Sequence, residues 1–345
     1  MPTLRRRILQ LLKAGTALCL VVCATVALPR PIAQEKSQSE RESGAVQVQM
    51  RNVMYHYTDD IAVHILRFGG ELVPATPGRP PVFDDKNSFS LHIAAAEISL
   101  DTQSLANVLN ANVFAGKDAP LKDISVGIES GRLKVKGKLH KKGDISFETA
   151  GQLSATADGK VRLHAEKIKA LHLPLKGLMD LFGLDIADLI KTGKVQGVEV
   201  DKDDLILDTG KILPPPRIAG RVTEVRLERN NIVQVFGAPQ KFSWSRAAAQ
   251  NYMAYHGNKL QFGKLTMADT DMVLIDPDPK DPFDFYLDHY KDQLVAGYSK
   301  TTRGNGLRVY MVDFNKLNRK ISDARGTGEA RGRHRPEPWH SVFNY

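Results

Sequence analysis

The side chains with the clearest capacity for chemistry are the aspartates between residues 269 and 288. They are Asp269, Asp271, Asp276, Asp278, Asp281, Asp284 and Asp288. Closely spaced carboxylates suit a hard cation such as calcium, which takes roughly six to eight oxygen ligands. The run lacks the glycine and the terminal glutamate of an EF-hand loop, and three prolines stiffen it. The pattern is more typical of an exposed Asp-Pro loop, but it leaves a metal-assisted hydrolase as an alternative function.

No other pattern in the chain predicts a catalytic centre. The ten histidines are scattered without a metal-ligand spacing such as HExxH, and no GxSxG, GxxxxGK or GxGxxG motif occurs. Both cysteines, Cys19 and Cys23, lie in the N-terminal apolar segment. The rest of the chain therefore contains no disulfide, thiolate metal site or cysteine nucleophile. We expect no cofactor, and a binding protein is favoured over an enzyme.

The element that would position an apolar site is a predicted helix after Asp101. Leu105, Val108, Leu109 and Val113 fall on one stripe at helical spacing. The Asp101 side chain can accept a hydrogen bond from a free amide of the first turn, and Gly116 is a plausible stop. This helix is predicted to bury its stripe against a sheet.

From residue 124 the period changes to two, which predicts antiparallel strands. Leu133, Val135 and Leu139 point to one face, and the cations of the other face are Arg132, Lys134, Lys136 and Lys138. This basic face is either a solvated outer surface or a contact for anionic headgroups. Asp158-Gly159 predicts a two-residue hairpin whose central residues both take positive φ. Further strands are predicted at residues 195–200 and 205–207.

A second, very apolar helix is predicted to begin at Pro174 and to end at Gly193. Its apolar stripe contains Leu175, Leu178, Met179, Phe182 and Ile186. Such a stripe is often simple core. It would also suit one wall of a groove for an apolar ligand.

The remaining segments are mostly strand-like. Residues 46–50, 61–65 and 89–100 alternate, whereas residues 71–85 form a Pro/Gly loop that supplies too few amides for a central strand. Beyond the triple proline at 214–216, two strands around Asn230-Asn231, a short helix at Ala247–Tyr255 and a strand-rich stretch to Ile275 are predicted. Residues 285–300 fit either strand or helix. The predicted class is α+β, mostly antiparallel β with two amphipathic helices packed in a curved sheet.

Charge and composition divide the chain further. Residues 1–33 have the layout of a signal peptide or an uncleaved N-terminal membrane anchor, and 34–45 form a polar linker. We expect a β-rich domain at 46–213, a β-rich C-terminal part at 214–315 that can belong to the same sheet, and a basic disordered tail at 316–345. The net charge of +9 lies mainly in the two ends. The nearly neutral body argues against nucleic acid as a partner.

The middle of the chain resembles the LmeA-like phospholipid-binding family of exported proteins, and more distantly the tubular lipid-binding folds. The resemblance lies in the succession GRLKVKGKL, GDISFETAGQLSATADGKVRLHAEKIKALHLPL, LFGLDIADLI and GVEVDKDDLILDTGKI. It covers about residues 90–213. The resemblance implies a long helix wrapped by a curved antiparallel sheet, with an apolar groove for acyl chains between them.

Together these observations predict an exported lipid-binding or lipid-transfer protein of the periplasm or cell envelope. Its groove would be lined by Leu105, Val108, Leu109, Leu175, Leu178, Met179, Phe182 and Ile186. Arg132, Lys134, Lys136 and Lys138 would contact anionic headgroups at a membrane surface. The alternatives are an envelope-assembly scaffold, whose groove is only a core, and a hydrolase that uses the loop at 269–288. The sequence specifies neither the lipid nor the oligomeric state.

Overall fold

The computed structural model describes residues 44–140, 144–166, 169–170, 195–238 and 249–317. These residues all belong to one contact unit of the chain. The predicted signal or anchor (1–33), the second helix (174–193) and most of the basic tail (316–345) lie outside the described residues.

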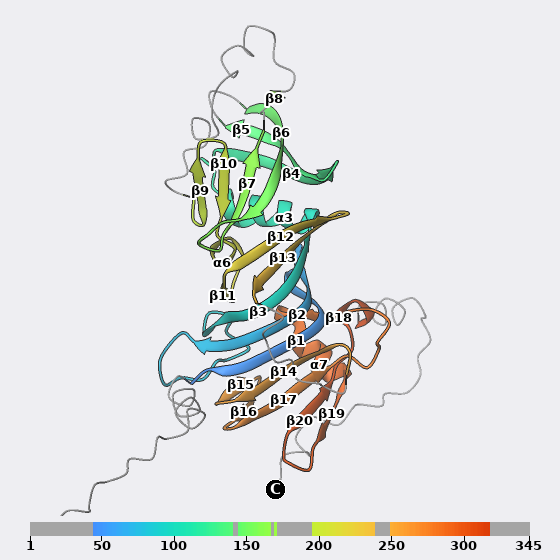
Figure 1. The fold of residues 1–345 in the computed structure, drawn as a ribbon. Helices are drawn as coiled ribbons and strands as arrows, with labels where there is room; N and C mark the ends of the chain where they lie inside the picture. The colour runs from blue at the N-terminus through green and yellow to red at the C-terminus, as the bar shows by residue number, and fades with distance from the viewer. Residues whose placement is uncertain (1–43, 141–143, 167–168, 171–194, 239–248, 318–345) are drawn as a thin grey trace, which may run out of the picture. The chain divides into compact units, whose positions relative to one another are not determined.

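The larger of the sheets is built on a meander of three long strands (Figure 1): β1 (Val46–Thr58), β2 (Ile61–Pro74) and β3 (Phe89–Asp101). The strand order is β12-β13-β3-β2-β1-β14-β17-β20-β19, with β11 beside β3 and β18 beside β1. The added strands are β11 (Arg217–Ala219), β12 (Val222–Glu228), β13 (Asn231–Gly237), β14 (Tyr252–Gly257), β17 (Thr270–Ile275), β18 (Phe283–Tyr286), β19 (Tyr298–Thr301) and β20 (Leu307–Tyr310). This sheet therefore takes strands from both sides of the triple proline. Most of its pairs are antiparallel, and the parallel pairs are β1–β18, β3–β11 and β17–β20.

Alternation explains which side chains the long strands bury. In β1, Val46, Val48 and Met50 are buried, but the buried series then continues at Val53. Asn52 takes a positive φ of 51°, a conformation that asparagine tolerates better than most residues. This residue shifts the phase of the alternation, so both halves of the strand contribute to the core.

The smaller sheet has the order β4-β5-β6-β7-β10-β9, with β8 beside β6. Its strands are β4 (Leu121–Glu129), β5 (Arg132–His140), β6 (Asp144–Ala155), β7 (Val161–Ala165), β8 (Lys169–Ala170), β9 (Val198–Asp201) and β10 (Asp204–Leu207). Strand β5 buries Leu133, Val135 and Leu139, as the alternation predicts. A short separate hairpin pairs β15 (Leu260–Phe262) with β16 (Leu265–Met267).

The hairpin at Asp158-Gly159 forms, but the predicted turn type is wrong. The Thr156 amide donates to the Lys160 carbonyl at 2.9 Å, and the Gly159 amide donates to the Thr156 carbonyl at 3.0 Å. The loop therefore has three residues, and only Gly159 takes a positive φ, of 87°. This is the arrangement of a type I turn followed by a left-handed glycine.

The first predicted helix is confirmed as α3 (Thr102–Val108), which continues as a π-helical turn over Leu109–Val113. The Asp101 carboxylate accepts from the Ser104 amide at 2.7 Å and from the Ser104 hydroxyl at 3.0 Å. It therefore caps the helix as expected. Short helices also form at α6 (Thr209–Ile212) and α7 (Tyr290–Ala296), with a 3₁₀ turn at Leu287–His289.

Two expectations are corrected, and one ambiguous stretch is resolved. The helix predicted at Ala247–Tyr255 is wrong in its described part, because Tyr252–Gly257 is strand β14. This strand lies between β1 and β17 and is buried on both faces, so its apolar run carries no period of two. The loop predicted at 71–85 begins later, since β2 continues to Pro74. The ambiguous stretch 285–300 contains strand, 3₁₀ turn and helix in succession.

The α+β class with mostly antiparallel strands is confirmed. A continuous cluster of buried apolar side chains joins α3 and residues of both major sheets. Within the described part of the chain, no helix is both long and apolar enough to cross a membrane.

Candidate functional site

The described structure contains a cavity lined by α3 and by strands of both major sheets. The centre of a water molecule can occupy a volume of about 110 Å³ in this cavity. Met50, Val63, Ile65 and Phe68 contribute from β1 and β2, and Phe147, Leu163, Leu205 and Phe236 contribute from β6, β7, β10 and β13. The strand alternation orients these side chains inward, because each is an inward member of a half-buried strand.

The first helix supplies the predicted groove residues Leu105, Val108 and Leu109, and all three line the cavity. The other predicted groove residues, Leu175, Leu178, Met179, Phe182 and Ile186, lie outside the described residues. Sequence reasoning missed the strand residues, although their signal was present. The alternation of β5 predicts one inward face for Leu133, Val135 and Leu139, and this face also lines the cavity.

Among the described residues, no side chain that lines the cavity is charged. Its polar side chains are Tyr55, Tyr57, Thr149, Thr209 and Gln234. Burial raises the pKa of the Tyr55 and Tyr57 hydroxyls well above the usual 10, so both stay neutral across the physiological pH range. The lining is therefore apolar and uncharged, which suits hydrocarbon far better than a polar metabolite.

Two places in the lining can still form a hydrogen bond with a ligand. The Thr149 hydroxyl is buried and has no hydrogen-bond partner in the described structure. The Thr209 hydroxyl donates to the Gln234 carbonyl oxygen at 3.1 Å, which leaves the amide NH₂ of Gln234 as a donor. An apolar ligand with one polar group could use either place. Thr149 has no distinctive signal in the sequence, because it is one ordinary member of an alternating strand.

Searches against protein-family models, curated proteins and solved structures found no match to this chain. The resemblance to the LmeA-like family stays a prediction from the sequence.

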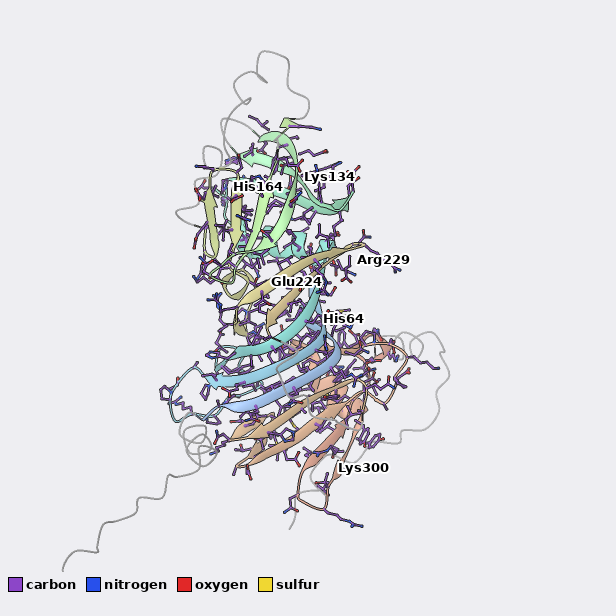
Figure 2. All side chains as sticks on the ribbon, viewed as in Figure 1. His64, Lys134, His164, Glu224, Arg229 and Lys300 are labelled. Atoms are coloured by element: carbon purple, nitrogen blue, oxygen red, sulfur yellow. The ribbon has the colours of Figure 1, made fainter. Side chains whose placement is uncertain are left out.

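The basic face of β5 is largely compensated by carboxylates of the neighbouring strands. Lys134 contacts Glu129 at 2.6 Å and Glu148 at 3.1 Å. The remaining pairs are Lys136–Glu148 at 3.4 Å, Lys138–Asp123 at 2.7 Å and Arg132–Glu166 at 2.6 Å. Hydrogen bonds from Glu129 and Glu148 raise the pKa of the Lys134 ammonium. Each of the four cations proposed to contact headgroups thus already has an acidic partner. Figure 2 labels Lys134 on this sheet.

The aspartate run is divided among several structural contacts. Asp271 pairs with Arg308 at 3.0 Å, and Asp288 pairs with Lys86 at 3.2 Å. Asp276 and Asp281 instead meet Asp313 from beyond the run, with carboxylate oxygens within 4.8 Å of one another. Among the described residues, this trio is the group of carboxylates that most resembles a cation site.

The protein itself supplies the donors at this trio. The Lys316 ammonium lies 2.7 Å from Asp313, 3.0 Å from Asp278 and 3.3 Å from Asp281. The two carboxylate oxygens of Asp276 accept from the Asp278 amide at 2.8 Å and from the Asn251 side chain at 2.9 Å. The pKa of the Asp276 carboxyl and that of the Asp313 carboxyl are both raised above the usual value. Burial causes the rise and outweighs the hydrogen bonds to the two groups, which act in the opposite direction. The arrangement acts as a structural clasp, with Lys316 at its centre.

Proposed function

We propose that this chain binds the acyl chains of a lipid in the cavity between its major sheets, as an exported lipid-binding or lipid-transfer protein of the cell envelope. The observation that supports this most strongly is the cavity lining, which is mostly apolar and contains no charged side chain among the described residues. Each methylene group moved from water into such a lining gains about 0.8 kcal/mol. No covalent step is required.

The energetic cost of the cavity supports a ligand over a plain core. Protein interiors are close-packed, and an empty cavity costs about 24 cal/mol per Å³. A volume of about 110 Å³ corresponds to a cost of about 2 to 3 kcal/mol. Hydrocarbon in the cavity would offset this cost, because it restores the missing dispersion contacts.

A lipid ester or hydroxyl group fits the two polar places in the lining. The unpartnered hydroxyl of Thr149 can donate to an ester carbonyl, and the Gln234 amide can do the same. A buried polar group without a partner costs about 1 to 3 kcal/mol, and a ligand oxygen would remove this cost. The lipid we propose therefore has at least one oxygen function close to its chains.

The proposal is tested by the lipid content of the full chain, isolated from the envelope fraction and measured by native mass spectrometry and solvent extraction. Ala165 lines the cavity from β7, so Ala165→Leu adds three carbon atoms to the cavity. The matched control is Ala150→Leu on β6, at a partly exposed position that does not line the cavity. We expect the first variant to lose most of its lipid and the control to keep the lipid content of the wild type.

Two results would contradict the proposal. One is wild-type protein that carries no lipid after gentle isolation. The other is equal lipid in wild type and Ala165→Leu when circular dichroism and melting show that both are folded.

Export is tested separately. A fusion of residues 1–45 to a reporter that is active only outside the cytoplasm should be active, because three arginines precede an apolar run in this segment. An inactive fusion that is present at normal levels would reject the proposed localisation, without bearing on the cavity.

A further inference from the structure

The large apolar side chains that stand exposed in the described structure gather at one place. Val295 is 69% exposed and Tyr298 is 50% exposed, and only two residues separate them in the chain. Val295 lies in the last turn of α7, and Tyr298 begins strand β19. A lone exposed apolar residue is ordinary, but two large ones beside each other suggest a contact surface.

The same place carries a stacked aromatic pair. Strands β19 and β20 form a hairpin at the edge of the larger sheet. Across it the rings of Tyr298 and Tyr310 stack, with centroids 4.6 Å apart and planes 11° from parallel. The Lys300 ammonium lies 5.4 Å and 5.5 Å from the two ring centroids. Figure 2 labels Lys300 on this hairpin.

Two cations of the hairpin, unlike those of β5, have no carboxylate partner in the described structure. Lys300 and Arg303 have no ion pair with any carboxylate of the described residues. The acidic groups nearby are already engaged: Asp271 pairs with Arg308 at 3.0 Å, and Asp292 lies 3.5 Å from a ring nitrogen of His289. The hairpin thus combines exposed apolar and aromatic side chains with two unpaired cations.

We propose that the β19–β20 hairpin, together with Val295, docks on an anionic lipid surface. Tyrosine rings are favoured at the level of the headgroups, where the ring is buried and the hydroxyl stays in water. Val295 adds apolar area beside them, and Lys300 and Arg303 meet lipid phosphates. The surface potential of anionic lipid attracts such cations within about one Debye length.

A protein partner that adds a strand to β19 is the less favoured occupant. The strand has only four residues and carries Lys300, and short edge strands with lysine are a common protection against edge pairing. The docking proposal does not depend on the cavity. A protein with no lipid inside could still bind a membrane through this hairpin.

The test is co-sedimentation of the full chain with vesicles of phosphatidylcholine alone and with one quarter phosphatidylglycerol, over a salt series. The variant Lys300→Glu/Arg303→Glu reverses both free cations. The matched control, Lys134→Glu/Lys136→Glu, reverses two lysines that already have carboxylate partners on β5 and its neighbours. A third variant, Val295→Ser, changes a residue too exposed to disturb the core.

We expect binding of wild type to the anionic vesicles that weakens as salt rises. The hairpin reversal should lower the partition constant about tenfold or more, Val295→Ser should lower it several-fold, and the β5 reversal should change it less than twofold. Lipid carried inside the protein should be the same in all variants.

Equal binding by the hairpin reversal and wild type at low salt would overturn the proposal. A larger loss in the β5 reversal would instead assign the membrane contact to the basic face of β5. Salt-independent binding that no variant changes would assign it to the N-terminal apolar segment. Melting curves establish that each variant is folded before its binding is compared.

Discussion

Thr149 places a hydroxyl group in the mostly apolar lining of the cavity. Its hydroxyl is buried, and the described structure provides no partner for it. Valine has nearly the same shape, so Thr149→Val removes the hydroxyl and leaves the packing almost unchanged. Because the lost group is unsatisfied, we expect the free energy of unfolding to stay equal or to rise by up to about 1 kcal/mol.

The same variant should lose affinity for an ester lipid several-fold, while its affinity for a plain alkane of equal length is unchanged. Isothermal titration with both ligands makes the comparison. A clear drop in melting temperature would instead show that the hydroxyl has a partner in the folded protein, and would remove Thr149 from the site.

His64 gives a prediction in pH. Burial lowers the pKa of its imidazole below the usual 6.5, and the ring nitrogen Nε2 donates to the side-chain oxygen Oδ1 of Asn52 at 2.8 Å. Below pH 6.5 the imidazole of His64 binds a proton in the unfolded chain but not yet in the folded chain. The free energy of unfolding therefore decreases as the pH falls through this window. His64→Gln keeps a donor but cannot titrate.

We therefore expect wild type to lose stability relative to His64→Gln between about pH 7 and pH 5, as measured by urea unfolding. Parallel curves for the two proteins over that range would mean that the folded and unfolded imidazoles titrate alike.

At the scale of elements, the N-terminal cap of α3 stabilises a helix that forms part of the cavity lining. Asp101 holds the first turn, and the helix that follows presents Leu105 and Val108 to the lining. Asp101→Ala should lower the free energy of unfolding by about 1 kcal/mol, whereas Asp101→Asn, which keeps an acceptor oxygen, should lower it by about half as much or less. Equal losses in thermal unfolding would mean that charge, rather than the hydrogen bond, stabilises this end.

A second element-scale prediction concerns the clasp on the segment between β17 and β18. Asn251 is fully buried, and its amide donates to Asp276, to the Asp278 carbonyl at 3.0 Å and to the Asp281 carbonyl at 2.6 Å. Asn251→Ala removes the donor from one buried and two partly buried acceptors, so we expect a loss of about 3 kcal/mol in urea unfolding. Asn87→Ala, in an exposed turn, is the control and should cost less than about 0.5 kcal/mol.

These elements also show why part of the structure could be predicted from the sequence. Strand β5 and helix α3 are half-buried, so their inward and outward positions differ in type, and the period identified them correctly. Strand β14 is buried on both faces, so the residues Tyr252–Tyr255 show no period of two, and the helix that the sequence predicts there is wrong. The aspartates were close in sequence, but their function as a clasp depends on Asn251 and Lys316. Pairing over such distances leaves no local signal.

At the scale of the whole molecule, the described chain ends in a contact that the fold needs. Asp313 is buried and accepts from the Asp284 amide at 2.9 Å, and Lys316 holds the clasp. Deleting residues 313–345 should therefore lower the melting temperature sharply or give insoluble protein. Deleting only residues 325–345, which contain few apolar side chains, should shift it by no more than a few degrees. A large drop in the shorter deletion would mean that Trp339, Val342 or Phe343 packs on the body.

The pairing of β1 has a consequence for how the protein is made. One edge of β1 meets β2 at once, but its other edge waits for β14 and β18, and the Asn52–Asn251 hydrogen bond spans 199 residues of chain. When the first two hundred residues have been synthesised, β1 can pair with β2 on one edge only. Its other edge, which later pairs with β14 and β18, is still unpaired. Contacts of such separation form slowly, and open edges aggregate. We therefore expect translation stalled before residue 250 to yield aggregates rather than a folded fragment.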